Sequence, residues 1–138
     1  MKALLDTNII IHREANKIVS QDIGILYRWL DRGKYTKCIH SATIEEIKKN
    51  PNKETVKLFL VKLDSYETIE IPSPIQDEVK KISESYDRTE NDLIDTSLLN
   101  EVFVGRVDIL ITEDKKIHKK ANALGIQDKV YTIDSFLE

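Results

Sequence analysis

The distribution of apolar residues along the chain predicts both strands and helices. Two runs are continuously apolar, Ala3-Leu4-Leu5 and Ile109-Leu110-Ile111. Unbroken apolar runs of this length are typical of strands that are buried on both faces, as in parallel sheets. The first strand therefore lies at the start of the chain and another lies within 108–112. Three more short segments are predicted to be strands: 37–41, 68–71 and 130–133.

Most of the remaining chain repeats apolar residues at helical spacing. The predicted helices are 22–32, 43–50, 53–63, 75–85, 89–103 and 114–124, with a short helix and a loop within 9–19. Gly33 suits a left-handed C-terminal cap of the first of these, and Gly125-Ile126 predicts a Schellman motif after the last. Strands that alternate with helices predict an α/β fold, a three-layer sandwich whose central, mostly parallel sheet is covered on both faces.

Composition limits the class of protein further. The 138 residues are 41% hydrophobic and 33% charged, which predicts a single domain, 1–138, without a disordered segment. No apolar run approaches the ~20 residues of a membrane span, and the single cysteine, Cys38, excludes an internal disulfide and is expected to be buried in a strand. We therefore expect a cytoplasmic protein without a membrane partner. Because the chain ends on Ser-Phe-Leu-Glu without a tail, we also expect a domain excised from, or fused within, a longer protein.

Carboxylates follow both of the continuously apolar strands. Asp6 ends the first, and Asp114 comes just after the second. If these strands are neighbours where the strand order of a doubly wound sheet reverses, the two acids face one crevice, where such sheets bind ligands. The alternative is that Asp6 or Thr7 caps the following helix and that Asp114 answers the dipole of its own helix.

Three further acids are candidates for the same crevice. Glu46 follows the strand 37–41, and Asp92 and Asp95 lie three residues apart in the helix 89–103 and share one of its faces. Each has a structural explanation as well. Thr43 with Glu46 fits a capping box, Thr89 with Asp92 is a weaker example, and Asp95 can be a solvated surface charge.

Several carboxylates in one crevice repel one another unless protons or cations intervene. Oxygen ligands without nitrogen or sulfur suit a hard cation such as Mg²⁺ or Mn²⁺. Jointly, therefore, the acids favour a metal site over a set of separate caps. The net charge of −3 argues against a broad basic surface for nucleic acid but leaves room for local basic patches.

Four short motifs resemble the PIN domain family in their order and spacing. They are Asp-Thr-Asn at 6–8, Thr-Ile-Glu-Glu-Ile at 43–47, Asn-Asp-Leu-Ile-Asp at 91–95 and Thr-Glu-Asp at 112–114. The likeness extends to Ile-His-Lys-Lys-Ala at 117–121 and to the closing Val-Tyr-Thr-Ile strand, so it covers nearly the whole chain. Asp-Thr-Asn alone is weakly specific, whereas the ordered set of four is a strong signal.

The resemblance implies a five-stranded parallel sheet between helices and the site of a metal-dependent ribonuclease. Carried over residue by residue, it makes Asp6, Glu46, Asp92 and Asp114 the catalytic acids. Glu46 fits the family's acid before an aliphatic residue better than Glu45 does.

The same resemblance implies the ligands of Mg²⁺ or Mn²⁺: Asp6, Asp92, Asp95 and Asp114. Asp95 stands where many relatives have a small apolar residue and some have a further acid. Asn8 and Thr112 match polar positions beside the metal site. The expected reaction is endonucleolytic cleavage of single-stranded RNA through one or two ions, leaving 5′-phosphate and 3′-hydroxyl ends.

Lysines near the acids are candidates for guiding the phosphates of the RNA. They are Lys48, Lys49, Lys53, Lys115, Lys116, Lys119 and Lys120, among which Lys115 directly follows an acid of the site. The alternative is that they are ordinary solvated residues of helix surfaces.

Other chemistries have less support in the sequence. The three histidines show no zinc-ligand spacing with Cys38, and there is neither a glycine-rich phosphate loop nor a nucleophile elbow. Two rivals stay open: an aspartate-based phosphohydrolase with Asp6 as nucleophile, and a module that binds RNA or protein without cleavage.

The resemblance also implies partners. Many small relatives are toxins of VapC type that an antitoxin holds inactive, whereas others process RNA or are fused to a second domain. The exposed face predicted for the helix 53–63 is a candidate surface for a homodimer.

Overall fold

The computed structural model describes residues 1–14 and 21–138 of the chain. Its five strands form one parallel sheet in the order β3-β2-β1-β4-β5. The strands are β1 (Lys2–Leu5), β2 (Thr36–His40), β3 (Glu67–Ile69), β4 (Ile109–Ile111) and β5 (Val130–Tyr131). The α/β sandwich predicted from the sequence is therefore confirmed.

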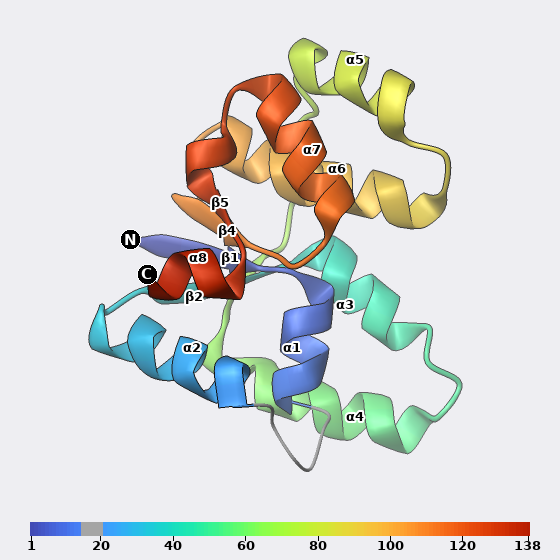
Figure 1. Ribbon diagram of the computed structural model, residues 1–138. Helices are drawn as coiled ribbons and strands as arrows, with labels where there is room; N and C mark the ends of the chain where they lie inside the picture. Colours follow the sequence, from blue (N-terminus) through green and yellow to red (C-terminus); the bar gives the residue numbers. More distant parts are fainter. Residues whose placement is uncertain (15–20) are drawn as a thin grey trace.

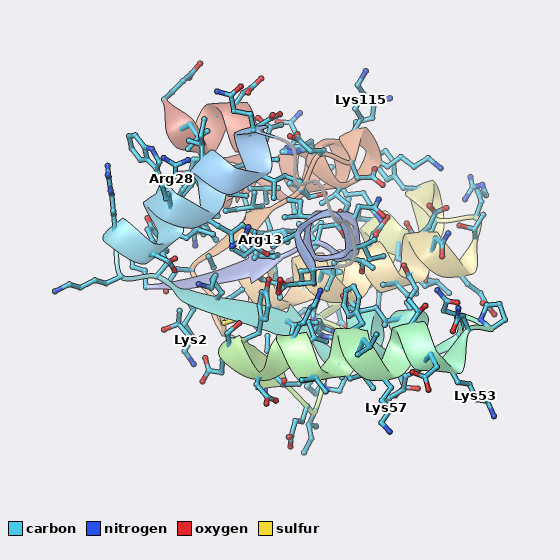
Figure 2. The ribbon with its side chains drawn as sticks, turned by 90° about the horizontal axis from the view of Figure 1, so that it is seen from below. Lys2, Arg13, Arg28, Lys53, Lys57 and Lys115 are labelled. Carbon is cyan, nitrogen blue, oxygen red and sulfur yellow. The ribbon has the colours of Figure 1, made fainter. Side chains whose placement is uncertain are left out.

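Helices cover both faces of this sheet (Figure 1). One layer consists of α1 (Thr7–Glu14), α2 (Gln21–Arg32), α3 (Ser41–Lys48), α4 (Lys53–Lys62) and the short α8 (Ile133–Leu137). The other consists of α5 (Asp77–Tyr86), α6 (Glu90–Phe103) and α7 (Lys115–Leu124). Figure 2 shows α4 on the outside of its layer, with Lys53 and Lys57 pointing away from the sheet. None of the helices in the described ranges has the length and apolar character that a membrane crossing requires.

The central strand β1 divides the core into two halves. Successive side chains of a strand point to opposite faces. Ala3 and Leu5 accordingly pack with the layer of α1 to α4, whereas Leu4 packs with α6 and α7. All three are fully buried, which explains why the run carries no polar residue. Cys38 lies in the second half and is buried as expected.

The strand order reverses between β1 and β4. The chain first builds outward from β1 through β2 to β3 and then returns to pair β4 with the free side of β1. Leu5 is in register with Ile111, and the backbone N–H of Asp6 donates to the carbonyl of Ile111 at 3.1 Å. The predicted neighbourhood of the two apolar strands is therefore confirmed.

The predicted helices and strands agree with the structure to within two residues at each end, and the cap after α7 is confirmed. Gly125 has a φ of 75°, and the N–H of Ile126 donates to the carbonyl of Ala121 at 3.0 Å. Of the segment 9–19, the part up to Glu14 belongs to α1, and the loop predicted after it lies outside the described residues.

The predicted left-handed cap at Gly33 was wrong by one residue. Lys34 takes the positive φ of 57°, and the N–H of Tyr35 closes the turn on the carbonyl of Leu30 at 3.0 Å. Glycine at position 33 has a different role. A Cβ there would lie 2.8 Å from the ring of Tyr35, so the residue allows this ring to pack against the turn.

The capping box that was the alternative role for Thr43 and Glu46 is not formed, because α3 begins two residues earlier. Its N-cap is His40, whose ring accepts a hydrogen bond from the N–H of Ala42 at 3.0 Å. The hydroxyl of Thr43 is buried in the first turn instead and pairs with the hydroxyl of Thr7 at 2.9 Å. Glu46 is thereby left available for another role.

A buried lysine ties α7 to the loop before α6. Lys120 is 2% exposed, and its ammonium group donates to Asp87 Oδ1 at 2.9 Å, to Thr96 Oγ1 at 3.0 Å and to the carbonyl of Asp92 at 3.2 Å. Burial acts to raise the pKa of Asp87, but hydrogen bonds from Ser83, Thr96 and Lys120 outweigh it and lower the pKa. This corrects the expectation that Lys120 contacts RNA from the surface.

We predict that Lys120→Met destabilises the protein by about 3–5 kcal/mol, because it leaves the carboxylate of Asp87 buried without its cation. Urea unfolding followed by circular dichroism measures the change. The control is Lys119→Met, which replaces an exposed lysine of the same helix and is expected to stay within about 0.5 kcal/mol of the wild type. Equal stability of the two variants would contradict a structural role of the buried pair.

Candidate active site

Asp6 is held at the end of β1 by hydrogen bonds to both of its carboxylate oxygens. Oδ1 accepts from the N–H of Thr7 at 2.7 Å, and Oδ2 accepts from the hydroxyl of Thr112 at 2.7 Å. The residue is 5% exposed. Burial raises the pKa of this carboxyl, the two hydrogen bonds lower it, and nearby Asp114 raises it further, so that the net direction is upward.

Thr112 connects the two acids that follow β1 and β4. While its hydroxyl donates to Asp6, the same oxygen accepts a hydrogen bond from the N–H of Asp114 at 3.0 Å. The carboxylate of Asp114 is in turn the N-cap of α7, where Oδ1 accepts from the N–H of Lys116 at 2.8 Å. Asp114 therefore caps α7 and also lines the pocket of Asp6, so its structural role does not exclude a role in the site.

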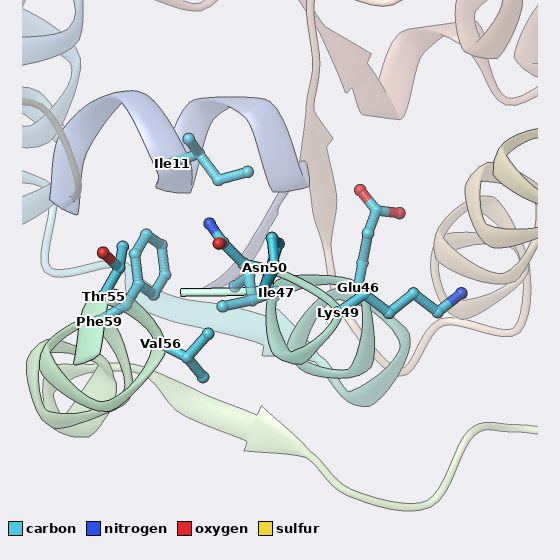
Figure 3. Close-up of a pocket in the computed structure, with 9 residues that line it drawn as sticks. Ile11, Glu46, Ile47, Lys49, Asn50, Thr55, Val56 and Phe59 are labelled. Carbon is cyan, nitrogen blue, oxygen red and sulfur yellow. The ribbon is translucent and has the colours of Figure 1, made fainter. Parts of the chain in front are cut away.

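Glu46 reaches the same place from α3, whereas Glu45 does not. Glu45 is exposed and lies 3.6 Å from the ammonium group of Lys48. Glu46 is half-buried, and burial together with the charge of Asp6 raises its pKa. Figure 3 shows its side chain extending from the end of α3. The structure therefore decides in favour of Glu46 as the acid near Asp6.

Asp92 is buried in the first turn of α6, where it completes a capping box. Its Oδ2 accepts from the N–H groups of Arg88 and Thr89 at 2.8 and 3.1 Å, and the hydroxyl of Thr89 accepts from the N–H of Asp92 at 3.2 Å. These backbone hydrogen bonds, that of Arg88 foremost, lower the pKa of Asp92. The capping role that the sequence offered as an alternative is present, and Asp92 does not line the pocket of Asp6.

Asp95, which the resemblance made a metal ligand together with Asp92, is the acid of α6 that lines the pocket. It lies one turn further along α6, is half-buried and lines the pocket together with Asp6 and Asp114. Burial, followed by the charges of Asp6 and Asp114, raises the pKa of Asp95 to about 7. Carboxylates that disfavour one another's ionisation to this degree lie close in a poorly hydrated space.

The pocket around these acids has a volume of about 120 Å³. Its walls come from the ends of β1 and β4, from α3 and from α6. The residues that line it are Asp6, Thr7, Asn8, Glu46, Asn91, Asp95 and Asp114. Asn8 was predicted to lie beside the site, and Asn91 was not, although its spacing of four residues from Asp95 places both on one face of α6.

The donors fit a hard cation that keeps part of its water shell. They are carboxylate and amide oxygens, which Mg²⁺ and Mn²⁺ prefer, and Mg²⁺ is commonly held through only one or two carboxylates and several waters. Among the side chains that the structure describes, no three of His, Cys, Asp or Glu are arranged to hold an ion directly.

Basic residues lie around this pocket rather than in it. Lys115 is exposed at the start of α7, Lys49 lies 3.7 Å from Glu90, and Lys116 lies 3.6 Å from Asp92. Lys115 does not line the pocket. Lys49 and Lys116 each lie near an acid of α6, and the charge of Lys49 also counteracts the rise in the pKa of Glu46.

No protein-family model and no curated protein matches this chain. Solved structures do match it along most of its length. VapBC2 from Rickettsia felis, bound to a DNA fragment from their promoter, aligns with a TM-score of 0.59 at 15% identity over 88% of this chain and 95% of the other. PAE2754 from Pyrobaculum aerophilum has a TM-score of 0.56 at 16% identity over 99% and 93%. FitAcB from Neisseria gonorrhoeae has a TM-score of 0.57 at 13% identity over 94% and 96%.

At this level of identity the similarity defines the fold and not the activity. The five-stranded parallel sheet with helices on both sides is PIN-like. The fold expected from the four sequence motifs is therefore confirmed, whereas the chemistry of the pocket has to be argued from its residues.

We predict that Thr112→Val raises the pKa of Asp6 further, because the variant removes a hydrogen bond that favours the ionised carboxyl. Loss of this buried bond also lowers the free energy of unfolding by about 1–3 kcal/mol. Titration of the side-chain carboxyl ¹³C resonance in metal-free buffer measures the pKa. Thr112→Ser keeps the hydroxyl and is expected to titrate like the wild type, and an unchanged pKa in the valine variant would show that the bond is not formed in solution.

Proposed function

We propose that this chain is a metal-dependent endoribonuclease that hydrolyses phosphodiester bonds of single-stranded RNA. One observation supports it above the others: four carboxylates from four separate segments, Asp6, Glu46, Asp95 and Asp114, line one pocket where the strand order of a PIN-like sheet reverses. Such a cluster costs stability through mutual repulsion. A function that uses the charges accounts for it better than four separate structural roles.

In this proposal Asp6, Asp95 and Asp114 hold Mg²⁺ or Mn²⁺, in part through water. A bound ion of this kind supplies an activated water and neutralises charge that develops on the phosphate. Glu46, at the edge of the pocket, orients the attacking water, while Asn8 and Asn91 offer amide groups to the waters or to the substrate. The hydroxyl of Thr112 keeps Asp6 in a single orientation.

Asp92 has a supporting role here. Its capping box fixes the first turn of α6, from which Asp95 projects one turn later. Lys49, Lys115 and Lys116 attract the RNA backbone toward the acids, which by themselves repel it.

Assays separate this proposal from two rival functions. A phosphohydrolase would cleave small phosphoesters through Asp6, and a binding module would take up Mn²⁺ and RNA without forming product.

Asp6→Asn is predicted to lower RNA cleavage at least about 100-fold and to leave the fold intact, since an amide keeps the size of the side chain but withdraws a charge from the ion. Gel analysis of a labelled single-stranded RNA with Mg²⁺ or Mn²⁺ measures cleavage, and circular dichroism verifies folding. Removal of the metal with EDTA is expected to lower RNA cleavage by the wild type by the same factor. Undiminished metal-dependent cleavage by Asp6→Asn would overturn the assignment.

A comparison of two substitutions in α6 tests which acid acts in the site. Asp95→Asn is expected to reduce cleavage and Mn²⁺ affinity strongly with little loss of stability, because it removes a charge from the pocket. Asp92→Asn is expected to lower stability, by about 1 kcal/mol for a weakened cap, and to retain more activity. Enzyme kinetics, Mn²⁺ titration and urea unfolding of both variants measure the difference. If Asp92→Asn loses more activity than Asp95→Asn, the catalytic acid of α6 is Asp92.

Protein partners are a further part of the proposal. The VapBC2 structure contains a complex on promoter DNA, which favours an antitoxin as partner for this chain also. Leu58 and Val61, on the outer side of α4, are 62% and 65% exposed. Contiguous apolar patches mark surfaces through which proteins associate, and these two side chains lie three residues apart on one face of the helix. We propose that two copies of the chain associate through this face and that an antitoxin binds the resulting dimer.

The purified chain is accordingly predicted to be dimeric, with a mass of about twice 15.9 kDa in light scattering coupled to size exclusion. The double variant Leu58→Asp/Val61→Asp is expected to be monomeric, because two charges cannot be buried at the interface without a large cost. The control is Ile71→Asp, which replaces an exposed apolar residue away from α4. A monomeric wild type would contradict the dimer and leave the antitoxin as the partner to be tested.

A further inference from the structure

A larger pocket of about 430 Å³ adjoins the acidic one and shares Glu46 with it. It lies between α1, α3 and α4 (Figure 3). Its walls are apolar, formed by Ile11, Ile47, Val56 and Phe59. Both its size and its apolar lining are typical of pockets that bind a small molecule or one residue of a larger ligand.

Polar groups lie at defined points of this pocket. Figure 3 shows the side-chain amide of Asn50 in the middle, between α1 and α4, with Thr55 on α4 and Lys49 beside Glu46. The amide oxygen of Asn50 accepts a hydrogen bond from the N–H of Asn52 at 2.9 Å. This bond orients the amide, and within the described part of the chain its NH₂ group has no partner and can donate to a ligand.

We propose that this pocket binds one base of the RNA strand, next to the phosphate that is cleaved at the acids. This inference rests on the proposed nuclease function and adds a subsite to it. A base has apolar faces and a polar edge, and proteins recognise single-stranded RNA through unstacked bases that they contact on both. The apolar walls match the faces, and the amide of Asn50 matches the edge.

The position of Glu46 sets which nucleotide enters. Because Glu46 lines both pockets, a strand whose phosphate lies at the acids places an adjacent nucleotide at the mouth of the larger one. Lys49 lies at the same rim and carries a charge that complements a phosphate. The NH₂ group of Asn50 can donate to an acceptor at the edge of the base, and because all four bases carry such acceptors this contact holds a base without selecting among them.

A protein partner fits this pocket less well. An apolar side chain would cover the amide of Asn50 without pairing with it, and burial of an unpaired amide is costly. The chemistry of the lining therefore favours a nucleoside over an apolar side chain.

The test uses Val56→Trp, which fills the pocket, and Val104→Trp, the same substitution at an exposed position after α6. Cleavage is measured on short RNAs that carry either a full base or an abasic residue beside the cut. The abasic residue is expected to lower kcat/KM of the wild type and of Val104→Trp about 10-fold, the scale of one lost base contact. Val56→Trp is expected to cleave the intact RNA about 10-fold more slowly and to be insensitive to the abasic residue.

A second measurement is independent of cleavage and of the folding of Val56→Trp. Uridine and adenosine, which carry no phosphate, are titrated into the wild type and into Asn50→Ala while methyl resonances of Ile11, Ile47 and Val56 are followed. Saturable shifts in the wild type, weakened by Asn50→Ala, support the subsite. Absence of these shifts, or equal cleavage of intact and abasic RNA, overturns it and assigns the pocket to a protein partner. If the wild type cleaves no RNA, the nuclease proposal fails, whereas the methyl shifts still decide whether the pocket binds a base.

Discussion

The parallel pairing of β1 with β4 is the constraint on which the rest of the molecule depends. It joins the first strand of the chain to one that follows more than a hundred residues later, with Leu5 in register with Ile111. Side chains at this junction are buried on both faces, so the run cannot carry a polar residue until the strand ends. The first positions at which acids are tolerated are therefore those just beyond the carboxyl ends, and two strands that end together bring Asp6 and Thr112 into hydrogen-bond contact.

The acidic pocket illustrates how a fold tolerates a local cost. Burial and mutual repulsion raise the pKa values of Asp6, Glu46 and Asp95, which means that the folded chain resists their ionisation. The surrounding structure offsets part of this through the hydroxyl of Thr112 and the N–H of Thr7 on Asp6. The more distant pair of Lys120 and Asp87 anchors α7 to α6, and the charge of Lys120 also counteracts the rise at Asp95. A cation supplied from solution would relieve the remaining repulsion, which is the physical link between this pocket and the proposed activity.

The acidic pocket and the apolar pocket differ in size and in the chemistry of their walls. One is small and lined by oxygen atoms, and the other is larger and mainly apolar. Glu46 belongs to both because α3 starts at Ser41, directly after β2, and so runs along the boundary between them. An early start of a single helix thus decides both which glutamate faces the acids and how near the apolar pocket lies.

Periodicity by itself determined the order and type of the helices and strands, because burial on one or two faces imposes patterns that local sequence carries. It also marked where the two central strands end, because an unbroken apolar run stops where burial on both faces stops. Acids follow both of these points in the sequence. Tertiary structure decided what depends on the exact start of a helix or on contacts between distant segments. The capping box of α6 occupies Asp92 and turns Asp95 to the pocket, α3 begins at Ser41 and frees Glu46, and Lys120 is buried because Asp87 meets it there. A shift of one residue rotates a helix by about 100°, and a buried partner is fixed only by the fold; sequence motifs therefore located the site but could not assign every acid in it.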